Sequence, residues 1–160
     1  MNAADPPSTT DVAAPDRILR ATIEVLRRGG IAAVSMRAVA AEADVALGLI
    51  SYHFNDKNGL IAATLRLLGE QDASLVALVD GVPADEQLRR ALRHVADPSF
   101  LQSDYLGVRL HLWSLAPIEP AFEQINREAQ IRYRNGLGRM IAAARPDLWP
   151  ADVARRAADI

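Results

Sequence analysis

Apolar side chains recur every three or four positions along the first half of the chain, which is the spacing of helices with one buried face. This pattern predicts helices over residues 16–28, 36–43 and 46–53, and a longer one from about 57 to 79. The side chains expected to face the core are Ile18, Thr22, Val25 and Leu26, then Val39 and Ala40, then Leu47, Ile50 and Phe54, and finally Leu60, Ile61, Thr64, Leu65, Leu68, Leu75 and Val76.

Residues that start or stop helices separate these segments. Gly29-Gly30 is expected to end the first helix, Ser35 to cap the second, and Ala43-Asp44-Val45 to form a tight turn. Asn55 or Asp56 can cap the long helix, which Gly81-Val82-Pro83 closes.

The second half of the chain continues the helical pattern. Helices are expected over about 84–96, 102–116 and 119–144, with another beginning at 150. One stripe of the 119–144 helix carries Phe122, Ile125, Ala129, Tyr133, Leu137 and Met140. Apolar and polar residues nowhere alternate with period two over a useful length, so the sequence predicts an all-α fold.

Composition mainly excludes certain kinds of site and segment. Half of the residues are apolar, enough to build a core, and the absence of cysteine excludes disulfides and thiolate metal sites. No run approaches the roughly 20 apolar residues that a membrane span needs, and the polar, Pro-rich start lacks the basic segment of a signal peptide. We therefore expect a disordered tail over residues 1–14 and a cytoplasmic protein without a membrane partner.

Charge and motifs do not indicate an enzyme. The chain carries a net charge of −2, so a prediction of DNA binding has to rest on local geometry. Neither G-x-S-x-G, a phosphate-binding loop, H-E-x-x-H nor a convincing carboxylate pair occurs, and His94 and His111 lack metal-ligand spacing. We expect no catalytic residue, no metal and no cofactor.

The short helices around the turn at Asp44 have the form of a helix-turn-helix. In such a unit the second helix enters the major groove of duplex DNA, and alanines at positions such as 38, 40, 41 and 43 permit the close helix crossing that it requires. A three-helix bundle of another kind would show the same spacing, so the pattern leaves both interpretations open.

The residues around the turn resemble those of a known family. The string VSMRAVAAEADVALGLISYHFNDKNGLIAATL is similar to the DNA-binding segment of TetR-type bacterial transcriptional regulators, over roughly residues 17–68. Ser35 opens the second helix, Tyr52-His53-Phe54 ends the third, and Lys57 starts the fourth, as in that family. The run ISYHFNDKNGL most resembles the repressor subtype of the choline-to-betaine pathway.

The resemblance implies a set of DNA-contacting residues, and their chemistry fits. Ser35 and Lys57 lie at expected helix N-termini, where free N–H groups and the helix dipole favour a phosphate. Arg37, Tyr52 and His53 can also donate to phosphate oxygens. The expected DNA-binding residues are Ser35, Met36, Arg37, Ala46, Leu47, Gly48, Leu49, Ser51, Tyr52, His53 and Lys57. Each also has a structural interpretation, as a helix cap, a packing aromatic or a solvated charge.

Two departures from the family pattern affect base recognition. Asp44 stands where the turn usually has glycine, and Asp tolerates a positive φ better than most residues. Ala46-Leu47 replaces a polar pair at the start of the third helix, which removes two expected hydrogen-bond donors. Base contact then falls to exposed Leu47, Leu49 and Ser51, with Gly48 permitting close approach, through thymine methyl groups or through DNA shape.

The remainder of the chain is expected to be regulatory. We divide the chain into a tail (1–14), a DNA-binding domain (15–56) and a helical domain for ligand binding and dimerisation (57–160). Residues 105–116 are apolar on nearly every face and should be buried all round, so Arg109 needs a partner. The candidate partners are Asp104, Glu119, Glu123 and Glu128. The alternative to a structural ion pair is a ligand pocket lined by Tyr105, Arg109, Trp113 and Tyr133.

The resemblance also implies a mechanism. A homodimer would place two recognition helices in successive major grooves of a palindromic site, and a small-molecule effector would shift the long connector and change their spacing. Family members usually continue further and dimerise through their last helix, so we expect the natural chain to extend beyond Ile160. The competing hypothesis is a helical adaptor that binds protein instead of DNA, favoured by the apolar stretch Ala46-Leu47-Gly48-Leu49.

Overall fold

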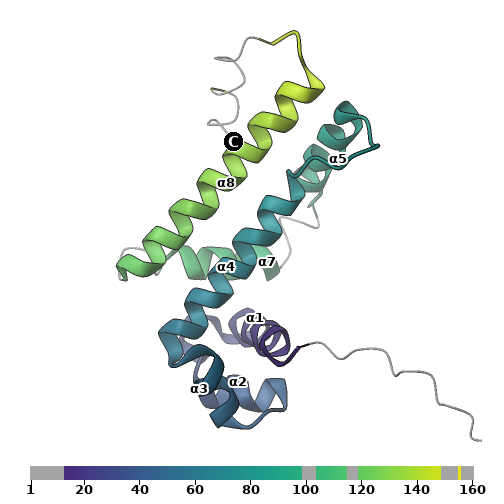
Figure 1. Cartoon of the computed structure of the whole chain (residues 1–160). Helices are drawn as coiled ribbons and strands as arrows, with labels where there is room; N and C mark the ends of the chain where they lie inside the picture. Colours follow the sequence, from purple (N-terminus) through teal and green to yellow (C-terminus); the bar gives the residue numbers. More distant parts are fainter. Residues whose placement is uncertain (1–12, 99–103, 115–118, 149–154, 156–160) are drawn as a thin grey trace, which may run out of the picture.

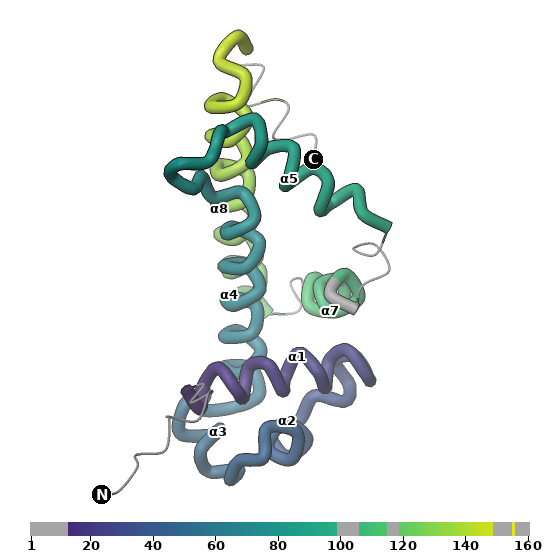
Figure 2. Tube along the Cα trace, turned by 90° about the vertical axis from the view of Figure 1, so that its right-hand side faces the viewer, coloured from purple at the N-terminus to yellow at the C-terminus, as the bar shows by residue number. Residues whose placement is uncertain are grey.

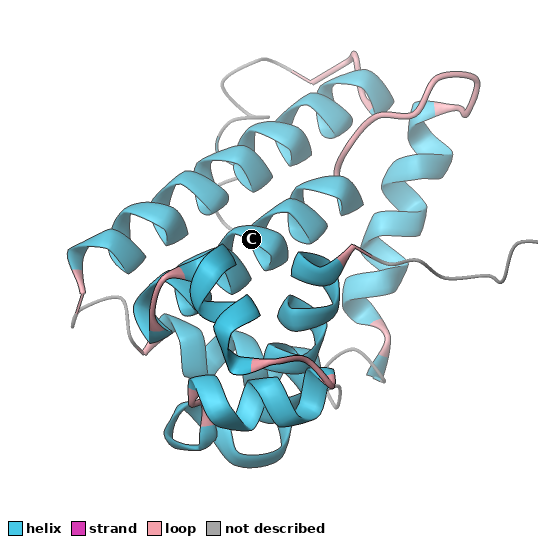
Figure 3. Cartoon of the chain, turned by 60° about the horizontal axis from the view of Figure 1, so that its bottom comes forward, coloured by secondary structure: helices cyan, strands magenta, loops and turns pink. Residues whose placement is uncertain are grey.

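The chain folds into helices joined by short loops (Figures 1 and 3). The computed structural model describes residues 13–98, 104–114, 119–148 and 155. No strand occurs in these ranges, which confirms the all-α prediction. None of the described helices is long and apolar enough to cross a membrane.

Three helices gather at one end of the molecule: α1 (Ala14–Ala33), α2 (Met36–Ala43) and α3 (Leu47–Phe54). The predicted inward face of α1 is confirmed: Ile18, Val25 and Leu26 are buried, and the buried Thr22 hydroxyl donates to Ile18 O at 2.9 Å. The expected break at the glycine pair takes the form of a kink, because Gly30 has φ 64° and helical structure resumes after it.

The long helix α4 (Lys57–Leu75) is four residues shorter than predicted, and Leu75, expected in the core, is exposed. The reason lies in α5 (Ala84–Ala96), which binds the loop that follows. The side-chain amide of Gln87 accepts from Val79 N at 2.8 Å and donates to Val79 O at 3.0 Å and Val82 O at 2.8 Å. The backbone groups of Val79 and Val82 therefore have hydrogen-bond partners outside a helix, and α4 ends at Leu75 instead of near residue 79.

The helices α4 and α8 (Pro120–Ala144) lie side by side and run in the same direction (Figure 1). Small residues bring their backbones together. A Cβ added to Gly69 would lie 2.8 Å from the Ala129 Cβ, and one added to Gly136 would lie 2.6 Å from a Val76 methyl carbon. The predicted apolar stripe of α8 is buried on this face, with Tyr133 partly buried among its neighbours.

The helix α7 (Asp104–Trp113) packs on α1 (Figure 2). Its residues Val108 and Leu112 are buried in the same cluster as the core of α1 to α4. The prediction that this helix is buried all round is wrong, since Leu110 and Trp113 are exposed on the faces that do not meet α1. The helix expected to begin at 150 lies outside the described residues.

Candidate nucleic-acid interface

The turn between α2 and α3 forms as the sequence predicted. Ser35 Oγ accepts from Ala38 N at 3.1 Å and caps α2. Asp44 ends that helix in the left-handed conformation with φ 51°, and Val45 N donates to Ala40 O at 3.1 Å. The chain therefore reverses within three residues, because Asp44 adopts a backbone conformation that glycine usually supplies.

One side of α3 packs against the other helices, and the opposite side is open. Ile50 is fully buried, and Phe54 and Leu49 pack partly buried against the core. Leu47 was expected near the core as well as on the DNA face, but its side chain is 41% exposed, so the core assignment is wrong. Leu49 is less exposed than the prediction of base contact required, because it packs against the core that contains Ile50.

The outward-facing residues of α3 include most of the candidates for DNA contact. These are Ala46, Leu47, Gly48, Ser51, Tyr52 and His53. Tyr52 is 80% exposed, and its ring meets that of His53 edge-on at a centroid distance of 5.0 Å. From α2, Ser35 and Arg37 are also exposed, whereas Met36 packs partly buried against the core.

The joint between α3 and α4 is a tight γ-turn. Asn55 has φ 67° and ψ −67°, and Asp56 N donates to Phe54 O at 2.8 Å. Asp56 then caps α4, accepting from Gly59 N at 2.8 Å, which decides between the two predicted caps. A Cβ on Gly59 would overlap the Phe54 carbonyl oxygen, so this residue has to be glycine for the turn to close.

Lys57 lies at the N-terminus of α4 and is partly buried. Its Nζ donates to Ile31 O at 3.4 Å, across to the last turn of α1. The ammonium group therefore lies between the kinked end of α1 and the first turn of α4, and it retains further hydrogens for an acceptor.

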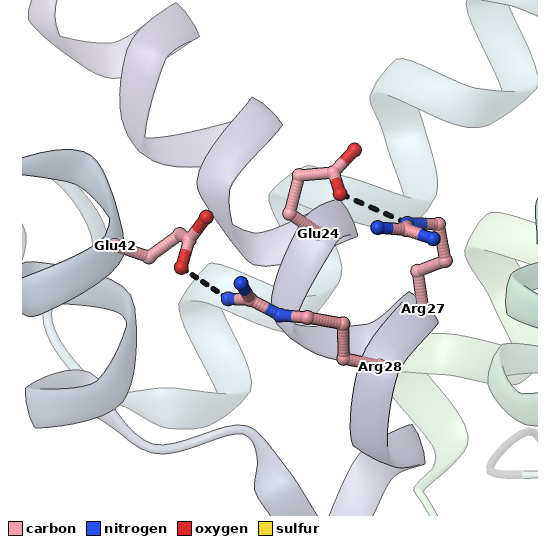
Figure 4. Close-up of polar contacts among 4 residues, drawn as sticks. All are labelled: Glu24, Arg27, Arg28 and Glu42. Carbon is pink, nitrogen blue, oxygen red and sulfur yellow. Dashed lines mark hydrogen bonds and ion pairs between the residues drawn. The ribbon is translucent and has the colours of Figure 1, made fainter.

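Ion pairs neutralise part of the charge around this surface (Figure 4). Arg28 of α1 pairs with Glu42 of α2, and Arg27 pairs with Glu24 at 2.9 Å within α1. Glu42, the acid of α2, is therefore compensated from α1. Among the described residues, Arg37 takes part in no ion pair, and it adds an exposed positive charge next to Ser35.

Comparison with known proteins identifies this arrangement. Residues 18–64, from α1 into α4, match the family of bacterial regulatory proteins called the tetR family. A structure of a TetR family member from Streptomyces coelicolor A3 is 32% identical, covers 82% of this chain and 75% of that one, and superposes with a TM-score of 0.59. The chain belongs to the TetR family.

Other TetR-type relatives extend the comparison. The HTH-type transcriptional regulator BetI of Ectopseudomonas mendocina (strain ymp) is 31% identical over 115 residues, which are 69% of this chain and 59% of that protein. The match thus spans less than two thirds of this relative's length. The multidrug binding protein EbrR, solved in complex with imidazole, is 30% identical, with 93% of this chain and 80% of that chain covered and a TM-score of 0.63.

A largely buried ion pair that the sequence analysis did not predict joins α4 and α7. Arg109 of α7 pairs with Asp72 of α4, and each side chain is only 14% exposed. Asp72 was not among the four acids proposed as partners, so the sequence analysis missed this pair. Asp72 falls in the helical register of Ile61, Leu65 and Leu68, and an acid at a position where the core face continues is the signal that could have revealed it.

Two other candidate ligand residues, Trp113 and Tyr133, lie near this ion pair. The Arg109 guanidinium is 5.3 Å from the centre of the Trp113 ring. Burial raises the pKa of the Tyr133 phenol, and the Asp72 carboxylate raises it further. The pair therefore brings Arg109, Trp113 and Tyr133 into one region, while the side chain of Tyr105 lies outside the described residues.

Two further features of the helices after α3 were not predicted. Asn126 of α8 is buried, and its amide nitrogen has no hydrogen-bond partner among the described residues. A cleft of about 710 Å³ lies between the end of α4, the following loop and α5, lined by Val79, Gln87, Arg90, His94 and Met140 among others. In the described part of the chain, no group of histidine and acidic side chains could hold a metal ion.

Proposed function

We propose that this TetR-family chain is a transcriptional regulator that binds duplex DNA through α3 and acts as a ligand-responsive repressor. The observation that carries the proposal is the helix-turn-helix itself: α3 is anchored by Ile50 and presents an uncovered face with Tyr52 at its end. The likeness to regulators named for the same motif supports it. The catalytic motifs are absent from the sequence, so we propose no enzymatic activity.

We propose that DNA phosphates contact the two helix N-termini next to α3. Ser35 at α2 and Lys57 at α4 combine hydrogen-bond donors with the positive end of a helix dipole, and Arg37 adds a full charge. Residues 15–56 would form the DNA-binding domain and residues 57–160 the regulatory domain.

A homodimer on a palindromic operator is the assembly we propose. Large apolar side chains lie exposed on α7 and α8, namely Leu110, Trp113 and Ile131, and a second copy would remove them from water. EbrR is described as a multidrug binding protein. By analogy, a small-molecule effector of this chain would bind near Arg109 and Tyr133, between α4, α7 and α8. A shift of α4 relative to α8 would then change the spacing of the two recognition helices.

The test is duplex binding by the full chain across a salt series. DNA from the region upstream of its own gene is tried first, and a random-sequence pool second. We expect affinity to fall steeply with salt, and a Tyr52→Ala, Lys57→Ala variant to bind weakly. Loss of one lysine contact should also flatten the log–log salt dependence by about 0.9. Arg127→Ala, at an exposed position on α8, is the matched control and should bind as the parent does.

The single lysine of the chain permits a second readout. Amine-reactive labelling will modify Lys57 besides the chain terminus, and bound duplex should protect Lys57 from the reagent. If neither DNA source is bound above the level of a scrambled duplex, the proposal is wrong, and the apolar face of α3 would point to the protein-binding adaptor instead.

A further inference from the structure

The uncovered face of α3 lacks the side chains that read most bases. Arg and Lys recognise guanine, Asn and Gln recognise adenine, and Asp and Glu recognise cytosine, each through hydrogen bonds at the major-groove edge. The stretch from Ala46 to Phe54 contains none of these six residue types. The bidentate and carboxylate contacts that most often recognise guanine, adenine and cytosine are therefore not available to this helix.

What α3 presents instead is apolar and closely approachable. Leu47, the first residue of the helix, is exposed, and the first turn of a recognition helix is the part that reaches base edges. An added Cβ at Gly48 would have no atom within 4 Å, so its surface is flat and unobstructed. Ser51 lies one turn further along, and its hydroxyl is 3.4 Å from Leu47 O, a long contact that leaves it able to turn to another partner.

The thymine C5 methyl is the one apolar group on the major-groove edge of a base pair. Leu47 offers the matching surface, and the bare backbone at Gly48 lets the groove approach closely enough for contact. Leu47 remains 41% exposed in the described structure, and burying that surface would be favourable.

We propose that α3 selects its site by apolar contact between Leu47 and thymine methyl groups, with Gly48 providing the clearance and Ser51 the hydrogen bond of the same turn. This inference rests on the proposed DNA binding. It assigns specificity to a leucine and a glycine, and it leaves Ser35, Lys57 and Tyr52 to position the helix on the backbone. The preferred half-site is accordingly one in which thymines occupy the positions beneath the first turn of α3.

Uracil provides the direct test, because it pairs as thymine does and lacks only the methyl group. A site is first selected from a random duplex pool with the full chain, and each thymine of one half-site is then replaced by deoxyuridine. We expect one or two positions at which affinity falls about fourfold, the effect of one buried methyl-sized group. A C·G pair at the same position should regain affinity when its cytosine carries a 5-methyl group.

The variant Leu47→Ala identifies the residue responsible. It should bind thymine and uracil sites equally, so that the fourfold preference disappears, while circular dichroism shows an unchanged helix content. The matched control is Leu92→Ala, an exposed leucine on α5, which should keep the preference for thymine.

The outcomes separate this inference from the function on which it rests. Failure of the pool to yield any bound sequence overturns the proposed function. A selected site that tolerates uracil at every position, or a thymine preference that survives in Leu47→Ala, overturns the inference alone and assigns specificity to DNA shape.

Discussion

The ion pair between Arg109 and Asp72 should behave as a buried pair, with a large cost when one partner is removed and a small cost when both are. Arg109→Met keeps an unbranched aliphatic stem and leaves the Asp72 carboxylate without its guanidinium in a site that is 14% exposed. Removing one partner of a buried pair costs about 3–5 kcal/mol, and we expect the lower end here because both groups retain some contact with water.

Replacing both residues should recover most of that loss. In the double variant Asp72→Leu, Arg109→Met neither charge remains, and two apolar side chains can pack between α4 and α7. We expect its free energy of unfolding to lie within about 1 kcal/mol of the parent, and above that of either single variant.

Urea unfolding followed by circular dichroism, at one fixed protein concentration, measures these differences. The matched control is Arg127→Met, which removes an exposed pair with Glu123 on α8 and should cost no more than about 0.5 kcal/mol. If Arg109→Met costs no more than this control, or if the two single effects simply add in the double variant, the pair is not a coupled buried interaction and the reasoning fails.

Three further substitutions test other parts of the structure. Gly59→Ala should lower the free energy of unfolding in urea by about 2 kcal/mol or more, because its Cβ would meet the Phe54 carbonyl. The control Gly48→Ala lies in open space and should cost nothing. Equal effects of the two substitutions would contradict the γ-turn. Leu112→Ala should cost about 2–5 kcal/mol by the same assay, since the side chain is fully buried, and a cost below about 1 kcal/mol would show that α7 does not share the core of α1. Because burial raises the pKa of Tyr133, the neutral phenol contributes stability below the ordinary tyrosine pKa of about 10 and loses it as the pH rises through the folded value. Tyr133→Phe should remove a step above about pH 10 from the phenolate absorbance titration, and an unchanged titration would refute this.

The sequence predicted the arrangement of α1 to α3 more fully than that of the helices from α4 onward. Ser35 and Asp44 lie in helix caps and turns, whose chemistry acts within a few residues, and both formed as expected. The end of α4 depends on the side chain of Gln87, which lies beyond the loop it binds, so local pattern placed it four residues too late.

The candidate site shows the same division between local and long-range causes. Tyr52 and Ser51 are exposed as predicted, because their position on the helix relative to Ile50 is fixed by helical periodicity. The partner of Arg109 required knowing that α7 lies near α4, and charge spacing along the chain carries no such information. The acids proposed from the sequence therefore did not include Asp72.

The core that α1 shares with Val108, Leu112, Phe122 and Ile125 has a consequence for recombination between relatives. If residues 15–56 were transplanted onto another regulator, the side chains of α4, α7 and α8 that complete this core would be left behind. Chimaeras that also carry the matching segments 57–68, 104–114 and 119–125 should fold, and shorter grafts should aggregate. The segment that folds with α3 is thus discontinuous in sequence, and under the proposed function an exchange of operator preference would have to carry parts of α4, α7 and α8 with it.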